Sequence, residues 1–175
     1  MKNLVDISHG SLEGLNVIIE IPKGSSNKYE YDEKLEVFRL DRALHSAMFF
    51  PFDYGFIPQT RAEDMDPLDA IVLTEQPTFP GCVIKTRIIG ALKMEDQAGN
   101  DIKIITVPIS SIEPRKSEIK SIKDLPNHVK KEIQDFMLNY KKLEPGKWAK
   151  VHGFLDVEHA KEIIRECLKR YKEMK

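Results

Sequence analysis

Residues that form redox centres and zinc sites are scarce in this sequence. It contains two cysteines, Cys82 and Cys167, and neither belongs to a CxxC motif. We therefore expect reduced thiols, which are typical of a cytoplasmic protein. Five histidines are present, but none forms an HxH or HxxxH pair, and this spacing argues against a zinc site. No Walker-type phosphate-binding loop occurs either, which excludes a P-loop nucleotidase.

Long apolar runs and an excess of basic residues are also missing. No apolar stretch approaches the ~20 residues that cross a bilayer, and the first residues lack the apolar core of a secretory signal. The net charge is −1, whereas general nucleic-acid binders usually carry a basic excess. We therefore expect neither a membrane nor a nucleic acid as a partner.

The composition is typical of a globular protein with one sizeable core. Apolar residues make up 41% and charged residues 31% of the 175 residues, which argues against a disordered chain. A chain of this length is large enough to bury a core without dividing into several domains. We therefore expect a single domain over residues 1–175.

The apolar pattern predicts short strands followed by two helices. Apolar residues at helical spacing predict one helix that starts at Pro126 and ends before Pro145, and another that is capped by Asp156. Strands followed by helices favour an α+β fold with a small curled sheet or barrel. The expected strands cover residues 15–21, 28–31, 35–40, 70–73, 82–94, 102–107 and 147–153, with further short strands within 47–58.

The most distinctive stretch is acidic and spans residues 64–69. It contains Asp64, Asp66 and Asp69, and an apolar run that is typical of a buried strand follows it. An extended backbone would point Asp64 and Asp66 in the same direction, and Pro67 favours extended geometry in the residue before it. Carboxylates gathered at the start of a strand suit a hard cation, Mg²⁺ or Ca²⁺, better than zinc.

Two other interpretations of the acidic stretch are possible. Asp-rich segments are common in solvated turns, and an Asp-x-Asp pattern alone is a weak signal. An EF-hand loop is the second possibility, because Asp64, Asp66 and Glu75 fall at its ligand positions. We reject it, because Asp69 occupies the position where that loop requires glycine and a strand-like run follows in place of a helix.

Further acids and bases are distributed over the predicted strands and the first helix. If they converge, the excess of carboxylates requires divalent metals, and the bases then match phosphate oxygens. This combination favours metal-assisted phosphoryl transfer to water. Periodicity alone would leave each base as a solvated surface charge. The candidate acids are Glu20, Glu30, Asp64, Asp66, Asp69, Asp96 and Asp101, the bases Lys28, Arg42, Lys103 and Lys141, and the hydroxyls Tyr54 and Tyr140.

These residues belong to a series of motifs in a fixed order. The motifs are IEIP (19–22), KYE (28–30), DR (41–42), PFDYG (51–55), DMDPLD (64–69), KMED (93–96), DIK (101–103), YK (140–141) and GKW (146–148). In their order and spacing the chain resembles the soluble inorganic pyrophosphatases of family I, from about Leu15 to the C-terminus. The resemblance implies an OB-like closed β-barrel of short, mostly antiparallel strands flanked by two C-terminal helices. It also implies a homo-hexamer and Mg²⁺-dependent hydrolysis of pyrophosphate to two phosphates by a metal-activated water.

The resemblance also implies a role for each motif residue. The general base would be Asp66, which accepts a proton from the attacking water. The metal ligands would be Asp64, Asp69 and Asp101 for the tightest ion, Asp96 for further ions, and Glu20 and Glu30 mainly through water. The residues that contact phosphate oxygens would be Lys28, Arg42, Lys103, Tyr140 and Lys141, with Tyr54 close by; Lys28, Arg42 and Tyr54 would also serve catalysis directly.

Three positions depart from the family pattern. The family usually has a small or polar residue at Met65, whose side chain we expect to point away from Asp64 and Asp66. A larger aliphatic residue is usual at Ala70, and many members have tyrosine at Phe50. Two rival functions remain, namely a non-catalytic OB-type barrel that binds nucleic acid or protein, and a metal-dependent hydrolase of organic phosphates.

Overall fold

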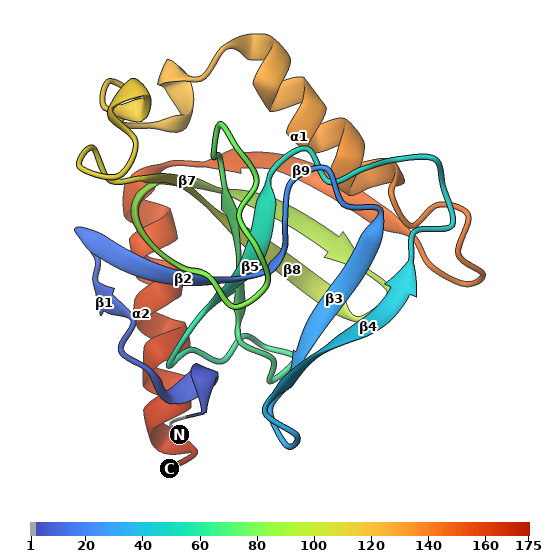
Figure 1. The fold of residues 1–175 in the computed structure, drawn as a ribbon, viewed down its shortest axis with the longest axis horizontal. Helices are drawn as coiled ribbons and strands as arrows, with labels where there is room; N and C mark the ends of the chain where they lie inside the picture. Colours follow the sequence, from blue (N-terminus) through green and yellow to red (C-terminus); the bar gives the residue numbers. More distant parts are fainter. Residues whose placement is uncertain (1–2) are drawn as a thin grey trace.

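The computed structural model describes residues 3–175, so residues 1 and 2 of the expected domain lie outside it. Strands predominate and two helices follow near the C-terminus (Figure 1), as expected for an α+β protein. The helices are α1 (Asn127–Asn139) and α2 (Val157–Glu173). The strands are β1 (Gly10–Ser11), β2 (Gly14–Ile21), β3 (Asn27–Asp32), β4 (Val37–Ala43), β5 (Asp53–Ile57), β6 (Leu68–Val72), β7 (Val83–Asp96), β8 (Gly99–Pro108) and β9 (Ala149–Leu155).

The main sheet has seven strands in the order β1-β2-β5-β6-β8-β7-β9. Strands β6 and β8 run parallel, and the other pairs in the sheet are antiparallel. Besides β5, β2 also pairs with β7, so the succession β2-β5-β6-β8-β7 returns to the strand on which it began. Most residues of β2 and all residues of β5 are buried, which agrees with the predominance of apolar residues in β2.

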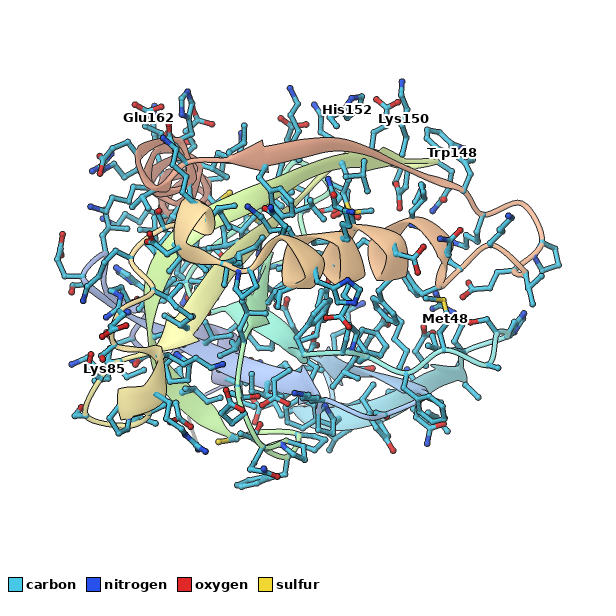
Figure 2. All side chains as sticks on the ribbon, turned by 90° about the horizontal axis from the view of Figure 1, so that it is seen from above. Met48, Lys85, Trp148, Lys150, His152 and Glu162 are labelled. Carbon is cyan, nitrogen blue, oxygen red and sulfur yellow. The ribbon has the colours of Figure 1, made fainter. Side chains whose placement is uncertain are left out.

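The two helices cover different parts of the sheet. Helix α1 contributes Phe136 to an aromatic group in which its ring centroid lies 4.7 Å from that of Phe50, and Figure 2 shows the neighbouring Met48 close to the end of this helix. Helix α2 packs on β7, and buries Ile164 and Cys167 in a separate apolar cluster. No helix within residues 3–175 is long and apolar enough to span a membrane.

Strands β3 and β4 form a separate two-stranded hairpin. Figure 1 shows it beside the main sheet, on the side away from α2. Its alternating sequence predicted the hairpin, and the observed strands agree with that prediction. The aromatic stretch 47–58 forms one strand, β5, and residues 47–52 are irregular. Proline at position 51 removes a backbone donor there, which is consistent with the absence of a ladder.

Close contact between β2 and β5 requires glycine at position 55. A Cβ atom on Gly55 would lie 1.9 Å from the carbonyl oxygen of Ile18. Both backbones are fixed by strand pairing, so neither can retreat. The substitution Gly55→Ala should therefore lower the free energy of unfolding by about 3 kcal/mol or more, measured by denaturant titration.

The matched control is Gly14→Ala on β2, the strand against which Gly55 packs. There the new Cβ would meet mainly the Cε of Lys85, at 2.6 Å, and the end of a lysine side chain can move aside. We expect that variant to change the free energy of unfolding by less than about 1 kcal/mol. Equal destabilisation by the two substitutions would contradict the steric explanation.

Candidate active site

One cavity of about 850 Å³ collects the predicted site residues. All thirteen side chains selected from the sequence line it, although they come from β2 to β8 and from the segment after α1. Their proposed roles stay predictions, but the structure brings the residues together. They are Glu20, Lys28, Glu30, Arg42, Tyr54, Asp64, Asp66, Asp69, Asp96, Asp101, Lys103, Tyr140 and Lys141.

Strand geometry decides which acid of a neighbouring pair faces the cavity. Asp96 lines it, whereas Glu95 contacts Lys150 (Oε1–Nζ, 3.2 Å) and His152 (Oε2–Nε2, 3.1 Å). Figure 2 shows Lys150 and His152 pointing outward from β9. Successive side chains of a strand point to opposite faces. Glu95 therefore points out to solvent, and Asp96 points into the cavity.

Buried lysines lie among the carboxylates. Lys103 is 5% exposed and its Nζ contacts both Asp69 and Asp101. Lys141 is 4% exposed and its Nζ lies 2.6 Å from Oδ2 of Asp96. Burial lowers the pKa of Lys103, but the charges of Asp69 and Asp101 outweigh it and hold that pKa well above its usual range. Lys103 is therefore a fixed positive charge on the cavity wall.

Negative charge still exceeds positive charge in the cavity. Ten carboxylates and six basic side chains line it. Burial, together with the charge of Asp69, raises the pKa of Glu20 to about 8, against the lowering effect of a hydrogen bond from the Tyr31 N–H. Burial and the charges of Asp64 and Asp69 also raise the pKa of Asp66. The cavity therefore disfavours ionised carboxylates and attracts cations.

The donor atoms of the cavity fit a hard cation. None of the described residues that line it is cysteine or histidine, so the available side-chain ligands are oxygen atoms, as Mg²⁺ prefers. Within residues 3–175, no three Asp, Glu, His or Cys side chains are grouped closely enough to form a ready-made metal site. The lysines account for this, because Lys103 lies between Asp69 and Asp101.

The acidic stretch forms a turn, so the prediction of an extended backbone at residues 64–66 was wrong. The Ala62 N–H donates to the Asp66 carbonyl (2.8 Å), and the Asp66 N–H donates to Oδ1 of Asp64 (3.1 Å). An aspartate that accepts the N–H two residues onward stabilises a turn. Met65 has a φ of 73° and is 48% exposed. The carboxylates of Asp64 and Asp66 are thus placed by a turn and not by strand alternation.

The other two departures from the family pattern are buried. Phe50 is 2% exposed, and its ring centroid lies 5.8 Å from that of Tyr54 and 6.1 Å from that of Tyr140. It therefore packs directly against two site residues. Ala70 is fully buried, and on β6 it pairs with Gly55 and with Ile104.

Sequence reasoning missed a buried carboxylate behind the site. Oε2 of Glu144 lies 2.9 Å from Nε of Arg42, and its side chain is 5% exposed. Arg42 also contacts its neighbour Asp41 through Nη1. Glu144 follows α1 by five residues and lies in no periodic pattern, so the sequence held no signal for this pair.

Comparison with known proteins assigns the chain to a family. The family model described as inorganic pyrophosphatase matches residues 17–172. The chain belongs to this family. The resemblance seen in the sequence is thereby confirmed, and the protein is an enzyme, an inorganic diphosphatase.

Individual relatives agree with the family match over nearly the whole chain. The inorganic pyrophosphatase of Thermus thermophilus is 48% identical over 176 residues, covering 98% of this chain and 99% of the relative. That of Saccharolobus solfataricus is 46% identical, covering 91% and 92%. A crystal structure of the Thermus thermophilus pyrophosphatase superposes with a TM-score of 0.94 at 47% identity, over 98% of this chain and 99% of that one.

The left-handed backbone at Met65 yields a prediction for this pyrophosphatase. Such a conformation costs an L-residue about 1–2 kcal/mol, whereas glycine adopts it freely. Met65→Gly should raise the free energy of unfolding by about 1 kcal/mol, as measured by denaturant titration. Met65→Ala removes the same side chain but keeps Cβ, and should bring no gain. If alanine stabilises as much as glycine, side-chain exposure and not the backbone is responsible.

Proposed function

We propose that this enzyme hydrolyses inorganic pyrophosphate to two phosphates by direct attack of water, with Mg²⁺ as its cofactor. The observation that carries the proposal is one cavity in which ten carboxylates surround buried lysines. Carboxylates supply ligands for hard cations, and the fixed positive charges of lysine and arginine match phosphate oxygens. Both are needed for a small, highly charged phosphoanhydride.

The carboxylates would hold the cofactor. When bound, Mg²⁺ supplies charge neutralisation for the phosphate oxygens and lowers the pKa of the attacking water. Supporting observations are the oxygen-only donor set and the excess of carboxylates over basic side chains in the cavity. The proposed ligands are Asp64, Asp69, Asp101 and Asp96, with Glu20 and Glu30 contacting the ions through water.

Asp66 would serve as the general base. It shares the turn with Asp64 and lines the cavity. Partial burial and the charges of Asp64 and Asp69 raise its pKa, and a carboxylate with a raised pKa accepts a proton from water more readily. Its role is to take one proton of the attacking water as the new phosphorus–oxygen bond forms.

The bases and tyrosines would bind the two phosphate groups. Lys103 and Lys141 are held in place by their carboxylate partners, so they need little reorganisation when substrate arrives. Burial raises the pKa of Tyr54 well above its usual range, so its hydroxyl stays protonated and able to donate. The proposed phosphate-binding residues are Lys28, Arg42, Tyr54, Lys103, Tyr140 and Lys141.

The proposal extends to the form of the protein. Pairing of β2 with both β5 and β7 supports a closed, OB-like barrel, and three adjoining apolar clusters support a single domain. The family resemblance implies a homo-hexamer, and large exposed apolar side chains such as Phe49 and Phe79 are consistent with subunit contacts. Two free thiols, Cys82 and Cys167, support a cytoplasmic location.

Phosphate release tests the reaction. We expect the purified protein to release phosphate from pyrophosphate in the presence of Mg²⁺ and to lose this activity when the metal is chelated. ATP serves as the control substrate. Its hydrolysis should be slower by a factor of about 100 or more, because a cavity whose basic residues fit two small phosphate groups would not accommodate the nucleoside of ATP. Faster hydrolysis of ATP than of pyrophosphate would instead favour the organic-phosphate hydrolase.

Removal of the proposed base should reduce turnover without unfolding the protein. Asp66→Asn should lower kcat about 100-fold or more, since general base catalysis contributes a factor of about 10²–10⁴. The melting temperature should stay near the parental value, because the turn keeps its backbone hydrogen bonds. Asp135→Asn, on the exposed face of α1, makes the same chemical change and should leave kcat unaltered. Parental turnover in Asp66→Asn would show that the base lies elsewhere.

A further inference from the structure

Two walls of the cavity carry acidic residues and belong to separate parts of the fold. One wall is the hairpin β3–β4, which has Glu30, Asp32 and Glu33 on the cavity. The other is the acidic turn that precedes β6, with Glu63 and Asp64 among its residues. Like charges on facing walls repel, and the hairpin has no strand pairing to the main sheet. Something must therefore hold the hairpin in place.

A bidentate ion pair joins the two walls. Nη1 and Nη2 of Arg61 donate to Oε1 and Oε2 of Glu33 at 2.9 and 2.6 Å. Arg61 lies three residues before Asp64, and Glu33 directly follows β3. Arg61 is only 9% exposed, so this charge pair is shielded from water more than an ordinary surface pair.

Arg61 is itself fixed to α2. Its N–H donates to the Cys167 carbonyl at 2.9 Å, and its guanidinium carbon lies 5.8 Å from the ring centroid of Tyr171. On the hairpin side, the amide of Asn3 donates to the Glu33 carbonyl at 2.7 Å. The ion pair therefore connects the end of the hairpin to a long, well-packed helix.

Further contacts tie the hairpin to the rest of the fold, among them the packing of Tyr31 and Phe38 on the cluster of Val5, Ile18 and Phe56 and one hydrogen bond within the site. The Tyr31 N–H donates to Oε1 of Glu20 at 2.7 Å. The second ion pair of this region, Arg39 with Asp32 (3.1 Å), joins two residues of the hairpin itself, and Arg39 is 64% exposed at its side chain. The Arg39 pair therefore cannot set the distance between the two walls, whereas the Arg61–Glu33 pair can.

We propose that Arg61 and Glu33 are positioning residues that hold the hairpin, with Lys28 and Glu30, against the acidic turn with Asp64 and Asp66. The proposal rests on the proposed function insofar as these four residues handle substrate and cofactor. Neither Arg61 nor Glu33 takes part in the chemistry. Their pairing sets the width of the cavity and hence the fit of pyrophosphate.

The test is a double-mutant cycle with Glu33→Gln, Arg61→Met and the double variant, assayed for pyrophosphate hydrolysis. Each single variant should raise KM about fivefold and change kcat less than about twofold, because a wider cavity weakens binding before it affects the chemistry. The double variant should resemble the single ones and not show the product of their effects, since both break the same contact. Glu36→Gln and Arg39→Met are the matched hairpin controls and should keep the parental KM.

Hydrogen exchange provides a second measurement that needs no activity. The backbone amides of residues 29–36 should exchange about tenfold faster in Glu33→Gln and in Arg61→Met, but not in the two control variants. Since Arg61 is buried, its variant also loses packing, whereas Glu33→Gln loses only the charge pair. A lower melting temperature with unchanged KM in both variants would show that the pair only stabilises the fold, and would contradict the positioning role. Unchanged exchange in Glu33→Gln would overturn the proposal even if the protein were to hydrolyse another substrate.

Discussion

The structure depends on placing many carboxylates in one cavity while compensating the repulsion between them. Lysine side chains solve part of this problem, because Lys103 contacts Asp69 and Asp101, and Lys141 contacts Asp96. Both lysines are buried. Their partners lie on other strands, except for Asp101, which is on the same strand as Lys103. Burial and the remaining negative charge raise the pKa of Glu20 and Asp66. The residual charge also makes the cavity attractive to cations and to a substrate that arrives with them.

A rigid sheet makes this arrangement possible. The strands β2, β5, β6, β7 and β8 are pinned by continuous pairing and by two apolar clusters beneath α1 and α2. Charged residues at their ends are therefore held at fixed positions, while the hairpin that completes the cavity is attached by side chains. The walls of the site thus have different physical origins, namely backbone pairing for the sheet, and side-chain packing and ion pairs for the hairpin.

Periodicity in the sequence predicted the elements well where one interaction dominates. The two helices, the hairpin and strands such as β2 follow from their apolar spacing, because burial of one face decides each of them. It failed at residues 64–66, where the turn requires a left-handed Met65, a conformation that no rule would assign to methionine. Convergence of the acids followed from the order of the motifs and not from periodicity. Contacts such as Arg61–Glu33 and Arg42–Glu144 join residues far apart in the chain, and no local pattern encodes them.

The environment of Lys103 also affects its reactivity towards acylating agents. Only the neutral amine is nucleophilic enough to react with such agents, and a pKa held well above the usual range leaves almost none of that form at neutral pH. An acyl group there would also remove the positive charge that Asp69 and Asp101 share. Lys103 is thus protected from acylation by the same carboxylates that it neutralises. Acylating agents should react instead with exposed lysines on the outer surface.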